Sequence, residues 1–206
     1  MRQVPRPAAT LILLRDSAAG PEVFMLQRSQ SAVFIAGAYV FPGGGLDESD
    51  GSARMRSRVL GLTDEEASRR LHVPAGGLAY YAGAVRECFE EAGILLAVDE
   101  RGAAPDPAHI ARLALERAAL NAGTLGFLEL LERERLCIPG DRIAYVSHWI
   151  TAPGRTRRYS TRFFVALAPQ GQGGSHDDGE TVASTWTRAQ AALDRNAKGE
   201  IELVFP

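Results

Sequence analysis

The amino-acid sequence predicts a mixed α/β protein of one domain, and three observations lead to this prediction. The chain of 206 residues is long enough to bury one substantial hydrophobic core. Strand-like segments lie toward both ends of the chain, and helix-like segments lie mainly between them. Hydrophobic residues make up 46% and charged residues 23%, with a net charge of -2. This composition is that of an ordinary globular protein and gives no reason to expect a nucleic-acid polymer as partner.

The chain shows neither a membrane segment nor a cysteine framework. No apolar run approaches the roughly 20 residues that cross a bilayer, and the first residues do not have the pattern of a signal peptide. Cys88 and Cys137 lack the spacing of a zinc site or a disulfide scaffold, and we expect both to be buried. We therefore expect a cytoplasmic protein without a membrane partner.

The first elements expected are three strands. Residues 8–14 and 22–27 are short β-rich runs, and the turn-like sequence DSAAGP between them predicts a hairpin. A third strand is expected at about residues 38–41. It precedes the sequence PGGG at residues 42–45, which has the composition of a glycine-rich turn.

Two helices are expected next. Residues 47–77 are irregular in pattern, but Thr63 and Glu66 have the spacing of a capping box and predict a short helix. Residues 78–92 carry apolar side chains at intervals of three and four, the stripe of a helix that faces a core. Gly93 is placed to end that helix.

The remaining elements follow from the same periodicities. They are helices over 107–122 and 124–135, a hairpin of 142–151 with 160–168, a strand around 180–186 and a short helix from Thr187. Gln190 stands three residues after Thr187, which predicts a second capping box.

The predicted helix over residues 78–92 has an unusual acidic face. At 3.6 residues per turn, Glu87, Glu90 and Glu91 fall within an arc of roughly 100°, opposite the apolar stripe. Like charges at this spacing repel one another. Three interpretations stay open: a solvated helix face, a structural acidic helix in an unrelated protein, or a site for a hard cation such as Mg²⁺ or Mn²⁺, which prefers clustered carboxylates.

The neighbouring motifs resemble the Nudix box of the Nudix hydrolases. In RECFEEAGI, every position that the family pattern specifies is matched, by Arg86, Glu87, Cys88, Glu90, Glu91, Gly93 and Ile94. In GGGLDESD, Gly44 matches and Asp50 stands where the family has Glu. About thirty-five residues separate Asp50 from Arg86 where the family has seven, so the box carries an insertion at about residues 51–78.

The segment before the box is similar to coenzyme A diphosphatase-type Nudix proteins. The positions that fit are Arg28, Ser29, Gly37, Phe41, Pro42, Gly43 and Gly44, whereas Val33 stands where that signature has a second Arg. The peroxisomal branch of these enzymes also has a large box insertion, and its TRFF strand resembles residues Ser160 to Phe164.

The resemblance implies a fold and an activity. The fold is an α/β/α sandwich with a mixed β-sheet and an inserted, mostly helical segment, in a single domain over residues 1–206. The activity is metal-dependent hydrolysis of a diphosphate linkage in a nucleoside-diphosphate-linked substrate, such as coenzyme A or acyl-coenzyme A. The resemblance also implies Mg²⁺ or Mn²⁺ as cofactor and a homodimer. The alternative is a Nudix-fold module that binds a nucleotide-type ligand without turnover.

The resemblance also implies roles for individual residues. Glu87, Glu90 and Glu91 with the Gly44 carbonyl would hold the metal, and Arg86, Glu87 and Glu91 would act in catalysis. Arg28, Gly43 and Gly44 would bind substrate. Two of these roles stay open, because Glu87 is either a ligand or a base held by Arg86, and Arg86 read alone is an i,i+4 partner of Glu90.

Two later segments supply further candidates. Catalysis needs a proton acceptor near the attacking water, and Glu180 before the predicted strand is a candidate, with Asp177 and Asp178 as rivals. The alternative for all three is a solvated acidic turn. Arg162 is the arginine of GRTRRYSTRFF that we expect to point inward and to bind substrate phosphate, because a planar guanidinium can donate two hydrogen bonds. An exposed hairpin with solvated arginines is the alternative.

Overall fold

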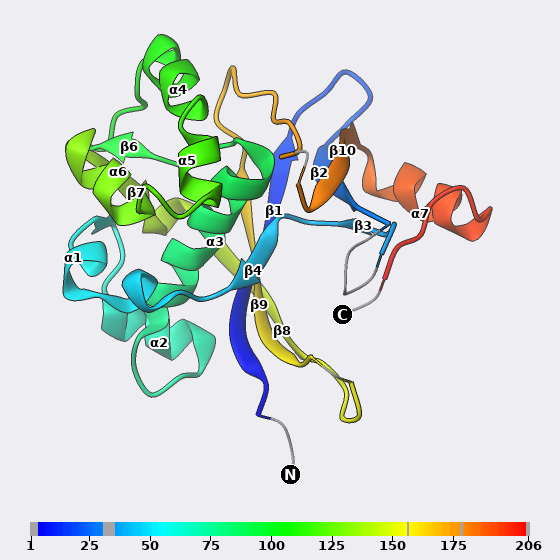
Figure 1. Cartoon of the computed structure of the whole chain (residues 1–206), viewed down its shortest axis with the longest axis horizontal. Coiled ribbons are helices and arrows are strands. Elements are labelled where there is room, and N and C mark those ends of the chain that lie inside the picture. Colours follow the sequence, from blue (N-terminus) through cyan, green and yellow to red (C-terminus); the bar gives the residue numbers. More distant parts are fainter. Residues whose placement is uncertain (1–3, 31–35, 156, 178, 205–206) are drawn as a thin grey trace.

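A seven-stranded mixed β-sheet forms the centre of the fold in the computed structural model, which describes residues 4–30, 36–155, 157–177 and 179–204 (Figure 1). The strand order is β10-β2-β1-β9-β8, with β3 paired to β2 and β4 paired to β1. The β1–β9 pair is parallel and the other pairs are antiparallel. The strands are β1 (Arg6–Arg15), β2 (Glu22–Arg28), β3 (Tyr39–Val40), β4 (Gly43–Gly45), β8 (Ala144–Ile150), β9 (Tyr159–Leu167) and β10 (Thr181–Thr187).

A smaller sheet and several helices lie beside it. The small sheet has the order β5-β7-β6 and pairs β5 with β7 in parallel. The remaining elements are the strands β5 (Val59–Leu60), β6 (Val98–Asp99) and β7 (Leu136–Pro139), the 3-10 helices η1 (Glu48–Gly51) and η2 (Gly140–Arg142), and the helices α1 (Ala53–Arg56), α2 (Asp64–Leu71), α3 (Gly77–Ala92), α4 (Pro107–Ala114), α5 (Arg117–Asn121), α6 (Phe127–Arg133) and α7 (Ala189–Ala197).

Hydrophobic side chains of β1 point alternately to the two faces of the large sheet. On β1, Leu11 and Leu13 point into the main core that contains α3, whereas Ile12 and Leu14 pack into a second cluster with Ala192 of α7. This is the two-residue period of a strand that is buried on both faces. The predicted α/β/α sandwich with a mixed sheet is therefore confirmed. The main core also includes Met55, Val59, Leu62, Ala67 and Leu71 from the region of the predicted insertion.

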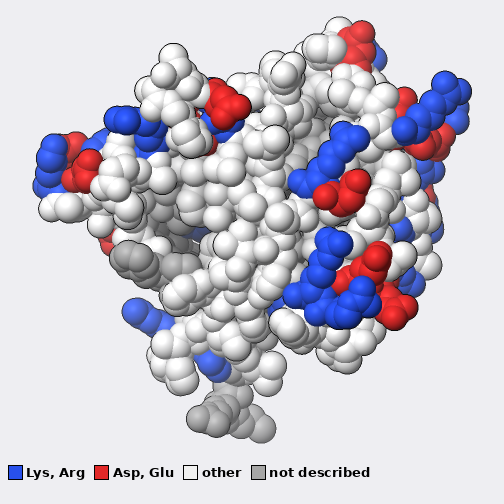
Figure 2. All heavy atoms as spheres, turned by 180° about the vertical axis from the view of Figure 1, so that it is seen from behind, with Lys and Arg blue, Asp and Glu red and all other residues white. Residues whose placement is uncertain are grey.

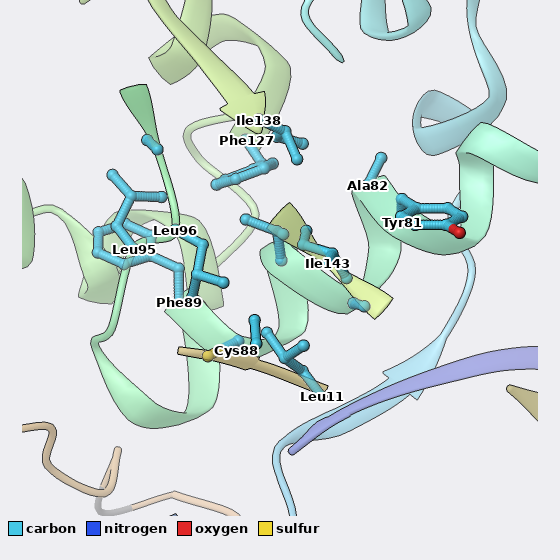
Figure 3. Close-up of a cluster of buried hydrophobic side chains, with 14 of the residues drawn as sticks. Leu11, Tyr81, Ala82, Cys88, Phe89, Leu95, Leu96, Phe127, Ile138 and Ile143 are labelled. Carbon is cyan, nitrogen blue, oxygen red and sulfur yellow. The ribbon is translucent and has the colours of Figure 1, made fainter. Parts of the chain in front are cut away.

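The apolar stripe of α3 anchors the main core, as the periodicity predicts. Tyr81, Cys88 and Phe89 are fully buried. Figure 3 shows Cys88 near Leu11 of β1, and the centre of the Phe89 ring lies 6.4 Å from that of Phe127 of α6. The helix ends at Gly93, whose φ of 66° is the left-handed conformation that glycine adopts without strain. Because this face of α3 is locked in the core, the orientation of its opposite face is determined as well.

Capping predictions had opposite outcomes at two helices. At α2, Thr63 accepts the Glu66 N–H and Glu66 accepts the Thr63 N–H, so the predicted capping box is confirmed. At α7 the prediction is wrong, because β10 extends through Thr187 and the helix begins at Ala189, after Arg188. Gln190 consequently lies one position too early in the helix for a capping box and donates to Asp194 instead.

Two further predictions need correction. The sequence PGGG does not remain a turn, because Gly43–Gly45 pair with β1 as strand β4. The single helix predicted over 107–122 is two helices, since α4 ends at Ala114 and α5 begins at Arg117. The hairpin of β8 and β9 and the burial of both cysteines are confirmed. In the described part of the chain, none of the helices is both long and apolar enough to cross a membrane.

Opposite charges lie side by side over the helical part of the surface (Figure 2). Arg54 of α1 pairs with Glu132 of α6, and Arg58 pairs with Glu100 at 3.1 Å. These ion pairs join the predicted insertion to α6 and to the turn after β6. Exposed pairs of this kind contribute about 0–1 kcal/mol each, so the shared core, rather than the charges, holds the two parts together.

Candidate metal and diphosphate site

The glutamates of α3 face strand β4, which lies beside the helix (Figure 1). Glu91 is 8% exposed, and its Oε2 accepts a hydrogen bond of 2.9 Å from the Gly43 N–H. A Cβ at Gly44 would lie 2.6 Å from both carboxylate oxygens of Glu87. No side chain therefore fits at position 44 while Glu87 keeps this place. The glycine-rich strand lets its backbone approach the acidic face of the helix.

Arg86 lies buried at the centre of the acidic cluster and neutralises part of its charge. Its Nη1 donates to Glu87 at 3.0 Å and to Glu90 at 2.8 Å, and its Nη2 donates to the Gly45 carbonyl at 2.8 Å. The i,i+4 pair with Glu90 is therefore present, but it is one of several contacts. Arg86 therefore joins α3 to strand β4 and orients the carboxylates of Glu87 and Glu90.

Asp50 completes this network. It is fully buried and accepts from Arg86 Nε at 3.1 Å and from Nη2 at 3.0 Å, the two-point geometry typical of a strong arginine–carboxylate pair. Its shorter side chain thus reaches the arginine of the box. A Cβ at Gly83 would lie 3.0 Å from Asp50 Oδ2, so this helical glycine provides the necessary room. Sequence reasoning missed Gly83, although a glycine inside a helical pattern is a signal of close packing.

The electrostatics of the cluster favour neutral carboxyls in the metal-free protein. Burial, followed by the neighbouring charge of Glu87, raises the pKa of Glu91 to about 8. Burial likewise raises the pKa of Glu87 to about 7, although Arg86 opposes the shift. The pKa of Glu90 is also raised by burial. A cation beside these oxygens would favour their ionised forms and remove the repulsion.

The donor set fits a hard divalent cation. The three glutamates accept the bonds described above through Glu87 Oε1, Glu90 Oε2 and Glu91 Oε2. Carboxylate oxygens are the ligands that Mg²⁺ or Mn²⁺ prefers. Among the described residues, no group of three or more His, Cys, Asp or Glu side chains is arranged so that it could hold a metal ion.

Strand pairing brings Glu180 and Arg28 to the same place. Thr181 pairs with Arg28 across β10 and β2, and Arg28 Nη2 donates to Glu180 Oε2 at 3.4 Å. The charges of both residues influence the pKa of Glu91, so they lie close enough to act on that carboxylate. The Glu180 side chain is 69% exposed, which leaves it accessible to solvent.

Asp177, an alternative to Glu180 as proton acceptor, is held by hydrogen bonds within its own loop. Asp177 accepts hydrogen bonds from the Thr181 hydroxyl at 2.7 Å and from the N–H groups of Gly179, Glu180 and Thr181. These bonds hold the pKa of Asp177 below its ordinary value despite burial. The Asp177 carboxylate thus organises the loop in front of β10. Asp178 lies outside the described residues, as does Val33.

Arg162 is buried, as predicted, but its described contacts go to the inserted region. Its Nε and Nη2 donate to the Leu71 carbonyl at 3.4 Å, and its guanidinium lies 4.4 Å from the centre of the Tyr80 ring. These contacts join β9 to the end of α2 and to the first half of α3. Binding of substrate by Arg162 stays a prediction.

Comparisons with known proteins agree with this geometry. The family model of the NUDT19 Nudix domain matches residues 53–206. The chain is 29% identical over 206 residues to an acyl-coenzyme A diphosphatase NUDT19 of Xenopus laevis, with 84% of this chain and 54% of the relative covered. The human acyl-coenzyme A diphosphatase NUDT19 is 29% identical over 225 residues, which cover 92% of this chain and 59% of the relative.

A solved structure shares the whole fold. The NUDIX hydrolase from Alicyclobacillus acidocaldarius superimposes with a TM-score of 0.74 and 28% identity, covering 99% of this chain and 88% of that one. The chain spans little more than half the length of the curated relatives that it matches. The match of the family model over most of the chain and the shared fold lead to one conclusion: this chain belongs to the NUDT19 Nudix domain family of the Nudix hydrolases.

Proposed function

We propose that the chain is a metal-dependent hydrolase that cleaves the diphosphate linkage of a nucleoside-diphosphate-linked substrate, with coenzyme A or acyl-coenzyme A as the preferred class. The observation that carries this proposal is the convergence of Glu87 and Glu91 on the backbone of β4, with Glu90 held beside them through the buried Arg86. The choice of coenzyme A rests on the names of the curated relatives.

In this proposal Glu87, Glu90 and Glu91 hold Mg²⁺ or Mn²⁺, with the Gly44 carbonyl as a further ligand. When bound, such an ion supplies charge neutralisation on the diphosphate and a lower pKa of the attacking water. Arg86 keeps Glu87 and Glu90 in place through its two Nη1 bonds. The ionised glutamates need a positive partner, and the diphosphate needs one as well, so metal and substrate are expected to bind together.

The residues around the cluster have complementary roles. Arg28 is proposed to bind a phosphate oxygen, and its bond to Glu180 and the effect of its charge on Glu91 support this role. Glu180 is proposed to accept the proton of the attacking water, and the exposure of its side chain supports this role. The backbone of Gly43 and Gly44 allows the diphosphate to approach closely. The proposal also keeps Arg162 as a residue that binds a substrate phosphate.

The proposal is tested by turnover. Purified protein is incubated with coenzyme A, acyl-coenzyme A and dinucleotide diphosphates, with Mg²⁺, Mn²⁺ or EDTA, and both products are identified by mass spectrometry. We expect metal-dependent cleavage of coenzyme A at the diphosphate. Glu91→Gln should lower kcat by about a hundredfold or more, because it removes a ligand charge of the site. Glu65→Gln is the matched control, since Glu65 is an exposed helical glutamate.

Two outcomes contradict the proposal. Ligand-induced stabilisation without products would indicate a binding module instead of an enzyme. Equal activity of Glu91→Gln and the wild type would remove the assigned role of the acidic cluster.

A further inference from the structure

The C-terminal end of α3 obtains its positive partner from another helix. The last carbonyls of a helix have no intrahelical donor, and a cation near them is favourable. The last turn of α3 contains no basic residue of its own. The Phe89 carbonyl accepts the Gly93 N–H, and the Ala92 carbonyl accepts the Ser175 N–H at 2.9 Å. The Glu90 carbonyl is left for a partner from outside.

Arg117 of α5 fills that place, together with Asn121 of the same helix, whose side-chain amide donates to the Glu90 carbonyl at 3.4 Å. The Arg117 Nη2 and Nε donate to the Glu90 carbonyl at 3.0 and 3.3 Å. The third donor, Nη1, bonds the Ser175 hydroxyl at 3.1 Å. A Cβ at Gly93 would lie 2.9 Å from Arg117 Nη1, so the glycine that ends α3 also leaves room for this guanidinium. Arg117 therefore contacts both the helix of the acidic cluster and the loop before β10.

That loop is held firmly against the segment after α3. Gln172 accepts from the Leu95 N–H at 2.8 Å and donates to the Leu95 carbonyl at 3.1 Å. A Cβ at Gly174 would lie within 2.8 Å of both Phe24 and Ile94, so the loop backbone lies directly on the core. Ser175 is the next residue, and its two contacts go to the end of α3 and to Arg117.

The same loop then delivers Glu180. Two residues after Ser175, Asp177 accepts the N–H groups of Glu180 and Thr181 and places them at the start of β10. Glu180 meets Arg28 beside Glu91. Pairing of β10 with β2 holds the backbone of Glu180, since the Ser29 N–H donates to the Glu180 carbonyl at 2.9 Å. The attachment of the loop to the end of α3 then joins this edge of the sheet to the helix that carries the glutamates, and Arg117 is part of that attachment.

We propose that Arg117 is a positioning residue, which fixes the sheet edge that carries Glu180 against the end of α3 by bonding the Glu90 carbonyl and the Ser175 hydroxyl at once. The inference rests on the proposed function but makes a claim about a residue outside the Nudix box and its preceding segment. Arg117 does not touch the reacting atoms. Its loss should lower the rate of the chemical step and leave substrate binding nearly unchanged.

The test compares Arg117→Ala, Arg117→Lys and Ser175→Ala in steady-state assays of coenzyme A cleavage with Mg²⁺. For Arg117→Ala we expect kcat to fall about tenfold or more, the size of effect that small misplacements cause, with KM within about twofold of the wild type. Added methylguanidinium should restore part of kcat. Lysine keeps the charge but loses the fork of donors, so Arg117→Lys should be intermediate. Ser175→Ala should lower kcat while its Tm stays at the wild-type value.

Arg112→Ala is the control, since this exposed arginine of α4 donates to the Ala108 carbonyl of its own helix. Hydrogen exchange at the Glu180 and Thr181 amides gives a readout that does not need activity, and we expect faster exchange in Arg117→Ala. Unchanged exchange, or a loss of kcat that Arg112→Ala shares, would overturn the inference. Failure of the wild type to cleave any diphosphate would instead overturn the proposed function, and the exchange result would still decide the role of Arg117.

Discussion

The stability of the metal-free protein should depend on pH through Glu91. Its pKa in the folded protein is about 8, well above the ordinary value of 4.5, because burial and the charge of Glu87 disfavour ionisation. Between these two values the folded state holds a proton that the unfolded state has released. Stability is therefore greatest at the acidic end of this range and falls as the pH rises toward 8.

The magnitude follows from the size of the shift. One retained proton corresponds to about 1.4 kcal/mol per pH unit, so Glu91 alone should cost the folded state about 2 kcal/mol between pH 5.5 and pH 7.5. For a chain of this length, that loss corresponds to about 4–8 °C in Tm. Glu87 should add to the slope, because its pKa is also raised, to about 7.

The assay is chemical denaturation in EDTA at pH 5.5, 6.5 and 7.5, for the wild type and for Glu91→Gln. The variant cannot ionise at this position and escapes this loss of stability. The free energy of unfolding of the variant minus that of the wild type should therefore rise by about 2 kcal/mol from pH 5.5 to pH 7.5. Titration of histidines is common to both proteins and cancels in the difference. Mg²⁺ should reduce the pH dependence of the wild type, since it favours the ionised carboxylate. Parallel pH curves of the two proteins in EDTA would refute the reasoning.

Two further predictions concern the support of the glutamates. Asp50→Asn should destabilise the protein by about 3–5 kcal/mol in denaturant titrations, because it removes the charge of the fully buried carboxylate that accepts from Arg86 Nε and Nη2. The exposed Asp47, 3.7 Å from the same guanidinium, should tolerate Asn within about 0.5 kcal/mol. Gly44→Ala should abolish metal-dependent thermal stabilisation and activity, because the alanine Cβ would displace Glu87. Gly45→Ala is the control and should preserve both, since nothing lies within 4 Å of a Cβ at that position. Equal behaviour within either pair would contradict this account of the site.

Local features were predictable because they depend on a few neighbouring residues. The apolar stripe of α3, its end at Gly93 and the capping box at Thr63 all follow from helix geometry over one or two turns. The same geometry places Glu87, Glu90 and Glu91 on one face. The prediction failed where a distant partner changed a local preference, as at Gly43–Gly45, which lie flat as a strand because β1 pairs with them.

The remaining features of the site join parts of the chain that are far apart. Asp50 lies 36 residues from Arg86, and Gly43 lies 48 residues from Glu91. The residues Arg28 and Glu180, separated by 152 positions, meet because β2 and β10 are neighbours in the sheet. No periodicity in the sequence contains these pairings. They depend on the order in which strands pair and on the packing of α3 against that sheet.

The sequence by itself determined which residues lie on the acidic face and which motif they belong to, since both are properties of a single helix and its immediate neighbours. Only the tertiary structure decided that Asp50 neutralises Arg86, that β4 donates to Glu91, and that Arg117 joins α3 to the loop of Glu180. The physical reason is that burial of the α3 stripe fixes the direction of its acidic face. Sheet pairing then determines which backbone and which charges this face meets.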